Sequence, residues 1–110
     1  RDAALPSARK DLFSYIVVPA YARAFERAGF ADEVAAVRAA HEARNREAAI
    51  AAVSERMVDA IDICGDAATV AAAVTAYRDA GVDVPVIMPL PWGEDRRAVI
   101  DETLRATADC

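Results

Sequence analysis

The sequence is poor in the residues on which disulfide-rich, metal-binding and membrane proteins depend. It has one histidine, one lysine and two cysteines, Cys64 and Cys110, whose separation fits neither a disulfide framework nor a zinc site. It contains no run of about 18 apolar residues that could cross a membrane, and no recognisable signal peptide. We therefore expect a cytoplasmic protein without a membrane span.

Clustered positive charge is also missing. The formal net charge is −5 at pH 7, which argues against nucleic acid as a partner, because affinity for a phosphate backbone comes mainly from Lys and Arg. With 55% hydrophobic and 28% charged residues, the 110 residues are typical of one globular domain, although alanine supplies much of the apolar fraction. The chain begins at Arg1 rather than at methionine, which predicts a processed product or a fragment.

A first long helix is predicted over residues 6–29. Pro6 and Ser7 are favourable at a helix start, and the apolar residues that follow have helical spacing. Pro19 removes one backbone hydrogen bond and clashes with the preceding turn, so we expect a kink or break near Val18. The apolar face of this helix comprises Leu12, Phe13, Ile16, Val17, Ala20, Ala24 and Phe25.

Three capped helices are predicted next. Asp32, preceded by Phe30, begins a helix that ends near Arg44, and Asn45 and Ser54 begin two shorter helices. The side chains of such residues accept hydrogen bonds from the free N–H groups of the first helical turn. The first of these helices carries Val34, Val37 and His41 on one side, and the next two carry Ile50 and Val53, then Met57, Val58 and Ile61.

The stretch over residues 65–91 is predicted to form a helix, a tight turn and a strand. Asp66 caps a helix over residues 67–80, and Gly81 closes it with a positive φ. The side chains expected to form the buried stripe of this helix are Val70, Ala73, Val74 and Tyr77.

Residues 82–88 are apolar and rich in β-branched side chains, as in a parallel strand covered by helices on both faces. No second strand is found, and burying its unpaired N–H and C=O groups would cost ~1–3 kcal/mol each. We therefore expect its partners in a missing part of the protein or in a second copy of the chain. A last helix follows over residues 94–106, with Val99, Ile100 and Leu104 facing inward.

Two runs of the sequence, and the helix after them, carry a resemblance to a known family. The runs are LFSYIVVPAYARAFERAGFADEV and AVSERMVDAIDICGDAATVAAAVTAYRDAGVDVPVIMPLP. They are similar to the C-terminal third of luciferase-like flavin or deazaflavin oxidoreductases, and most similar to the actinobacterial branch that depends on coenzyme F420. The resemblance covers residues 1–106 and consists of patterns of apolar and small residues rather than a catalytic signature.

The resemblance implies an α/β fold, the C-terminal portion of a (β/α)8 TIM barrel, mostly helical in this chain with one parallel strand over residues 82–88. Residues 1–110 would then form an incomplete domain whose N-terminal two thirds, with most coenzyme-binding residues, is the missing partner. The implied function is hydride transfer between coenzyme F420, or FMN, and a small organic substrate, or oxygen activation if the coenzyme is FMN. The isolated chain is expected to be inactive.

The sequence departs from this family at one place. Many relatives have threonine, proline and glutamate after the glycine that corresponds to Gly65, whereas this chain has Asp66, Ala67 and Ala68. The change keeps the helix cap but calls into question any phosphate contact made there by a threonine.

Four residues are candidates for contacts with the coenzyme or substrate. The working face of such a barrel lies at the C-terminal ends of its strands, which implies that Met88 and Trp92 are apolar walls against a flat ring system. Tyr15 and Tyr21 flank Pro19 in a segment that the resemblance implies is near the mouth of the site, where a tyrosine can donate a hydrogen bond to a substrate carbonyl. The alternatives are that Trp92 closes the end of the barrel and that both tyrosines are core residues. No catalytic residue and no metal ligand is assigned.

Other reactive side chains have plainer interpretations. His41 lies on a charged helix and is interpreted as solvated, and Cys64 as a buried apolar cysteine. Glu42, Glu47 and Glu55 have arginines at helical spacing, which is typical of surface ion pairs. No phosphate-binding glycine-rich loop and no cluster of metal ligands is found.

Three functions are open from the sequence. The first is the C-terminal segment of the oxidoreductase described above. The second is a stand-alone helical assembly module that forms a homo-oligomer through its single strand, because an acidic, alanine-rich helical chain with apolar stripes fits this on composition. A small enzyme complete in itself is the least supported, because no acid–base or nucleophile arrangement is found.

Overall fold

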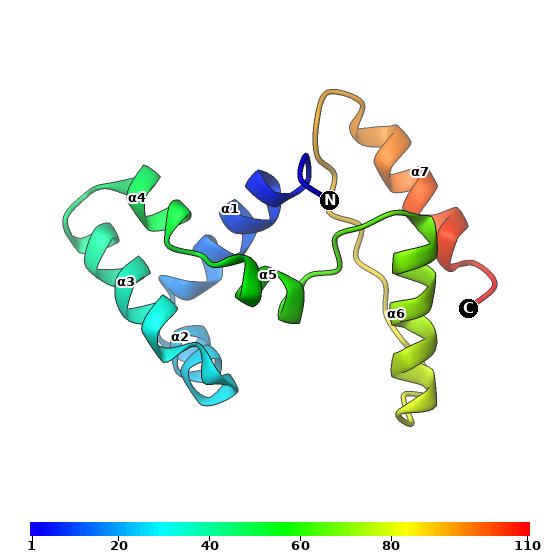
Figure 1. Cartoon of the computed structure of the whole chain (residues 1–110), viewed down its shortest axis with the longest axis horizontal. Helices are drawn as coiled ribbons and strands as arrows, with labels where there is room; N and C mark the ends of the chain where they lie inside the picture. Colours follow the sequence, from blue (N-terminus) through cyan, green and yellow to red (C-terminus); the bar gives the residue numbers. More distant parts are fainter. The chain divides into compact units, whose positions relative to one another are not determined.

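The structure, a computed structural model that describes all 110 residues, is built of helices joined by loops (Figure 1). The chain divides into two compact units, which we call the N-terminal unit (Ala8–Asp62) and the C-terminal unit (Arg1–Ser7 with Ile63–Cys110). The elements in chain order are α1 (Leu5–Ile16), α2 (Pro19–Phe25), η1 (Glu26–Phe30), α3 (Ala31–Glu42), α4 (Arg46–Ala51), α5 (Glu55–Ile61), α6 (Ala67–Asp79) and α7 (Arg96–Thr107).

The predicted break in the first helix is confirmed. Helix α1 ends at Ile16, and Val18 has an extended backbone (φ −89°, ψ 121°) before Pro19 begins α2. The residue before a proline is pushed out of the helical region by the proline ring, while the fixed φ of proline suits the first position of a helix. Pro19 therefore both ends α1 and starts α2.

The N-terminal unit has a dense apolar core. Helices α3 and α4 pack against each other, and α2 and η1 pack against α3. The buried apolar side chains of this unit are Ala8, Leu12, Phe13, Ile16, Ala22, Phe30, Val34, Val37, Ala49, Val53, Met57 and Val58. The inward faces predicted for the first four helices are therefore largely confirmed, with Ala22 buried where Ala20 and Ala24 were expected.

A bend at Gly29 joins η1 to α3. Its φ of 103° lies in the left-handed region that glycine enters without a steric penalty, and a Cβ there would meet nothing within 4 Å. Arg56 from α5 holds this bend, because its guanidinium donates to the carbonyl oxygen of Gly29 (3.1 Å) and to Oε1 of Glu33 (2.7 Å) and lies 4.6 Å from the centre of the Phe30 ring.

The predicted caps at Asn45 and Ser54 are confirmed. Oδ1 of Asn45 accepts from the backbone N–H of Ala48 (3.1 Å), and Oγ of Ser54 accepts from that of Met57 (3.1 Å). The predicted cap at Asp32 is wrong, because the chain turns directly from η1 into α3 and Asp32 lies in the first turn. Its negative charge still suits the helix N-terminus.

Few side chains of the C-terminal unit are buried. Helix α6 is capped by Asp66 and ends before Gly81 (φ 106°), as predicted, and it packs against α7. Only Val74 of the predicted stripe is buried, and Tyr77, near the end of the helix, is exposed. Leu104, expected to face inward from α7, is also exposed.

The predicted strand over residues 82–88 is wrong, and with it the α/β fold class. The chain is helical and has no strand, and residues 83–91 run as an irregular, thread-like segment with no backbone hydrogen bond (Figure 1). A strand needs a partner ladder, which no other segment supplies, and Pro85 lacks the N–H group that a central strand donates. The apolar side chains of Val84, Val86 and Met88 are consequently 78%, 88% and 73% exposed.

The longest helix, α6, has 13 residues, and a helix across the hydrocarbon core of a bilayer needs about 20. None of the helices is therefore a candidate membrane span. The cytoplasmic location stays a prediction.

Candidate functional site

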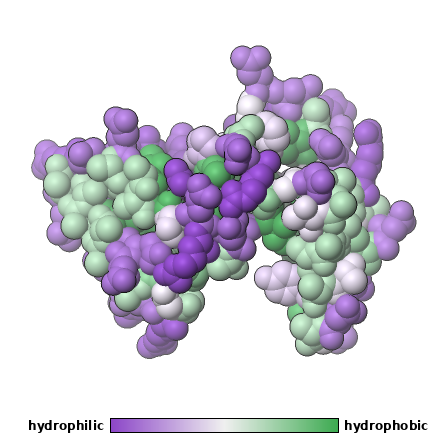
Figure 2. All heavy atoms as spheres, in the orientation of Figure 1, coloured by the Kyte–Doolittle hydropathy of each residue, from purple (hydrophilic) through white to green (hydrophobic).

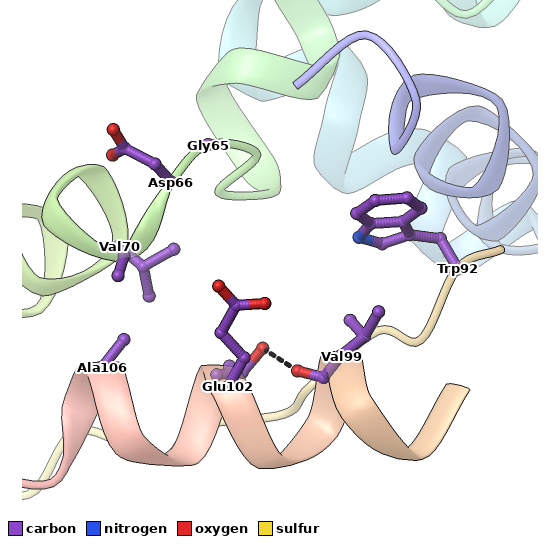
Figure 3. A pocket seen from close by; sticks show the side chains of 9 residues that line it. Gly65, Asp66, Val70, Trp92, Val99, Glu102 and Ala106 are labelled. Carbon is purple, nitrogen blue, oxygen red and sulfur yellow. Dashed lines mark hydrogen bonds between the residues drawn. The ribbon is translucent and has the colours of Figure 1, made fainter. Parts of the chain in front are cut away.

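A small pocket in the C-terminal unit is the candidate site. It has a volume of about 160 Å³ and lies between the N-terminus of α6 and one face of α7 (Figure 3). Its lining residues are Gly65, Asp66, Ala67, Val70, Trp92, Val99, Glu102, Thr103 and Ala106. The pocket is thus partly apolar, with two carboxylate-bearing residues and one indole at its edge.

The loop at the start of α6 fixes one side of this pocket. Oδ1 of Asp66 accepts from both the backbone N–H and the hydroxyl of Thr69, each at 2.8 Å. These two hydrogen bonds hold the pKa of Asp66 below its usual value, so this carboxylate stays ionised. Glycine is required at position 65, because an added Cβ would lie 2.6 Å from Cγ2 of Thr69.

Glu102 and Trp92 face the interior of the pocket. In Figure 3 the carboxylate of Glu102 projects from α7 toward the pocket centre, and the indole of Trp92 lies on the opposite side. No hydrogen bond or ion pair engages the Glu102 carboxylate. Thr103, by contrast, donates its hydroxyl to the Val99 carbonyl oxygen (2.8 Å) and offers no free donor.

The structure brings only one of the four predicted contact residues into this pocket. Trp92 lines it, whereas Met88 does not and is largely exposed. Tyr15 and Tyr21 lie in the N-terminal unit, where their rings meet edge to face with centroids 5.0 Å apart. Tyr21 is half exposed, so the interpretation of this residue as a core tyrosine is wrong. Contacts of the four residues with a coenzyme or substrate stay predictions.

The pocket side of α7 was not recognised in the sequence. Val99, Glu102, Thr103 and Ala106 have the i, i+3, i+4, i+7 spacing of one helical face. A carboxylate within such a face is unusual, and Glu102 is therefore the feature of the sequence that could indicate a pocket on this side of α7. It was hidden because Ile100 and Leu104 suggest a competing apolar face one residue away.

Asp62 is the most strongly perturbed carboxyl group of the N-terminal unit. Burial, and to a lesser degree the nearby charge of Asp11, raise the pKa of Asp62 to about 6. Its Oδ2 atom is buried without a hydrogen-bond partner. Glu33 behaves in the opposite way: burial disfavours its charge, but hydrogen bonds from its backbone N–H, Arg56 and Ser54 hold the pKa of Glu33 below the usual range.

The remaining reactive residues form no centre. The ring of His41 meets Phe13 edge to face with centroids 5.6 Å apart. The two cysteines form no disulfide and are partly exposed, so the interpretation of Cys64 as a buried cysteine is wrong. No group of three or more His, Cys, Asp or Glu side chains is arranged to hold a metal ion.

Comparison with known proteins identifies the class of protein. The sequence profile of the luciferase-like monooxygenases matches residues 1–84, so an oxidoreductase of the monooxygenase type is indicated. The chain belongs to the luciferase-like monooxygenase family, which confirms the family resemblance. No curated protein and no solved structure matches the chain.

Members of this family use flavin or F420 coenzymes, but the pocket does not fit either group. Sites for ligands of that size usually enclose roughly 300–1,000 Å³, and this pocket has about 160 Å³. Both coenzymes also carry a phosphate, which the carboxylates of Asp66 and Glu102 would repel. The pocket is therefore not a coenzyme site.

Proposed function

We propose that the chain is one segment of an oxidoreductase that transfers a hydride between FMN or coenzyme F420 and a small organic substrate. The family match over residues 1–84 carries this proposal. When bound, the coenzyme supplies the hydride chemistry, and the protein orients the two reactants and excludes water. The segment is inactive by itself, because its pocket does not fit the coenzyme.

The exposed apolar side chains of the C-terminal unit support a second part of this proposal. Val84, Val86 and Met88 lie on alternate residues of the irregular segment over residues 83–91 and are each more than 70% exposed. Apolar surface of this kind marks an interaction site. We assign Val84 and Val86 to contacts with the rest of the enzyme, beyond the residues of this chain, and Met88 to the ligand contacts that follow.

Four side chains are proposed to contact the coenzyme or substrate in that larger protein. Tyr21 and Met88 are accessible, and Tyr15 supports Tyr21 through the edge-to-face contact of their rings. Trp92 is partly exposed at the edge of the pocket. A tyrosine hydroxyl can hold a substrate carbonyl by donating a hydrogen bond, and Met88 and Trp92 can pack against a flat ring.

Coenzyme binding tests this proposal without knowledge of the substrate. The chain alone, and the chain joined to the polypeptide encoded directly upstream of Arg1, are each titrated calorimetrically with FMN and with coenzyme F420. We expect no micromolar binding by the chain alone and tight binding of one coenzyme by the longer polypeptide. Adenosine monophosphate, which has a phosphate but no flavin ring, is the control ligand. The oxidoreductase assignment is wrong if neither coenzyme binds the longer polypeptide.

A second candidate function is assembly of the chain with a copy of itself. The same exposure of Val84, Val86 and Met88 favours it, since no charged residue lies between Asp83 and Glu94 to oppose contact of two copies. Burial of these side chains between two molecules would remove apolar surface from water. Sedimentation velocity separates the two candidates, because only the second predicts a tight, well-folded dimer of the isolated chain.

Substitutions sharpen this sedimentation test. In the double variant Val84→Ser and Val86→Ser the dimer should dissociate at concentrations at which the unaltered chain is dimeric. Ala72→Ser, on an exposed position of α6, is the matched control and should leave the dimer intact. A monomeric unaltered chain would exclude the assembly function.

A further inference from the structure

We propose that the end of α5 is a pH-sensitive hinge, at which the last helical turn opens locally when Asp62 loses its proton and closes when the proton returns. The inference is independent of the proposed oxidoreductase function. It rests on a buried carboxyl oxygen without a partner, on the position of this carboxyl at the end of a helix, and on the nearby charge of Asp11 in α1.

Asp62 is the first residue beyond α5. Its backbone is extended (φ −101°, ψ 151°), but its N–H still donates to the carbonyl oxygen of Val58 (2.8 Å). It is also the last residue of the N-terminal unit, and residues 62–66 link α5 to α6 without helical structure (Figure 1). A movement of Asp62 can therefore break one hydrogen bond and loosen the link, while Met57 and Val58 stay in the core.

The carboxyl of Asp62 is poorly placed to carry a charge. Its Oδ2 atom is buried and accepts no hydrogen bond, and it lies beside the partial negative charge of a helix C-terminus. An ionised oxygen without a partner gains free energy by moving into water. A protonated carboxyl is neutral and has an O–H donor, which suits a helix end where the last carbonyl groups lack partners. Ionisation therefore favours the open form.

The neighbouring charged side chains do not offset this effect. The other charged residues of α1 and α5 are Arg9, Lys10, Asp11, Glu55, Arg56 and Asp59. Arg9 pairs with Glu55 at the opposite end of α5 (3.9 Å), and Arg56 pairs with Glu33. Burial and the charge of Asp11 both raise the pKa of Asp62, from 3.8 to about 6, and no cation lowers it. The closed form is therefore favoured below pH 3.8, and opening increases as the pH rises through about 6.

Amide hydrogen exchange followed by NMR measures the opening. The full chain is compared near pH 4 and near pH 7 through protection factors, which correct each amide for its intrinsic exchange rate, including the effect of side-chain ionisation. The amides of Ile61 and Asp62 report on the end of α5. The amide of Ala52, which donates to the Ala48 carbonyl oxygen at the end of α4 (3.0 Å), is the internal reference.

The expected change is local. Protection of the Ile61 and Asp62 amides, relative to that of Ala52, should fall about fivefold between the two pH values, because the side chain of Asp62 is only partly buried and solvent weakens the effect of its charge. Opening confined to a helix end and its link is typical of the least stable parts of a fold.

Three variants assign the effect to Asp62 and Asp11. Asp62→Asn keeps the shape of the side chain but cannot ionise, so its protection ratio should not change with pH. Asp11→Asn removes the neighbouring charge and should lower the midpoint pH of the change. Asp32→Asn removes the same charge from an exposed residue of α3 and should leave the midpoint where it is. Circular dichroism of each variant verifies that the helices remain folded.

Any one of three results would overturn the proposal. The first is a protection ratio that is the same near pH 4 and near pH 7. The second is a pH dependence that persists in Asp62→Asn. The third is an equal midpoint in Asp11→Asn and Asp32→Asn.

Discussion

The two units of this chain differ in how many of their apolar side chains are buried. In Ala8–Asp62 twelve apolar residues are buried, whereas in Ile63–Cys110 the only buried one is Val74. Apolar residues are not scarce in the second region, and hydrophobic surface is visible over both units in Figure 2. What differs is the supply of neighbouring surfaces, because α3 packs with α4 and with the α2–η1 turn, while α6 has only α7.

This comparison shows that hydrophobicity alone does not decide burial. A stripe on a helix becomes core only where another element of the same unit lies against it. The N-terminal unit meets this condition within about 55 residues and should supply most of the folding free energy of the chain. The C-terminal unit keeps its apolar side chains available for other molecules.

The largest expected effect comes from deleting a core side chain. Ile16→Ala should lower the free energy of unfolding by about 3 kcal/mol, because Ile16 is completely buried and its loss leaves a cavity. Val86→Ala, in the other unit, should change it by less than about 0.5 kcal/mol. Urea denaturation followed by circular dichroism measures both, and equal effects would contradict the difference between the units.

Gly29→Ala and Gly81→Ala make the same change at the ends of two helices, one in each unit. Both glycines have φ above 100° and open space around a new Cβ, so the cost is conformational, about 1–2 kcal/mol. We expect that loss in full for Gly29, which lies in the unit with the core, and a smaller shift of the unfolding midpoint for Gly81. A larger loss of stability for Gly81→Ala than for Gly29→Ala would contradict the conclusion that the N-terminal unit supplies most of the folding free energy.

Asp62→Asn tests the electrostatics of the N-terminal unit. The unfolded carboxyl loses its proton near pH 3.8 and the folded one near pH 6, so ionisation of Asp62 lowers stability progressively as pH rises through this window. The variant should be more stable than the unaltered chain by about 1 kcal/mol above pH 6, a value reduced for the partial exposure of the side chain, and equally stable near pH 4. Thermal melts at both pH values measure this, with Asp83→Asn, the same change at an exposed residue outside the N-terminal unit, as control.

The smallest effect on stability is expected in the irregular segment over residues 83–91. Val86→Ser should alter the free energy of unfolding by less than about 0.5 kcal/mol, because the side chain is 88% exposed. The variant should nevertheless bind less of a dye that fluoresces on apolar surfaces. Undiminished dye binding would mean that the accessible apolar surface lies elsewhere.

Local features of the fold were predictable from the sequence. Asn45, Ser54 and Asp66 cap the helices that they were expected to begin, and Pro19 breaks the first helix, because each effect depends on residues within one turn. Gly81 ends α6 for the same kind of reason. The Asp32 cap failed because the bend at Gly29 moved the start of α3 to Ala31.

Features that depend on distant neighbours were not predictable. Tyr77 and Leu104 have the right spacing for burial, but no element packs over them. The strand over residues 82–88 needs a hydrogen-bonded partner, which this chain does not contain. Of the residues that line the candidate site, Trp92 is predicted from the sequence. Glu102 is not, because its place in the pocket depends on which face α7 turns toward α6.

The prolines of the irregular segment over residues 83–91 have a consequence for aggregation. Pro85, Pro89 and Pro91 all occupy odd positions, and alternate residues of an extended chain direct their backbone groups to the same edge. In an extended conformation that edge would lack three amide donors, whereas growth of an amyloid-like fibril needs donors along both edges. As a strand, this exposed run of apolar residues could therefore pair along one edge only, which opposes the stacking of fibrils.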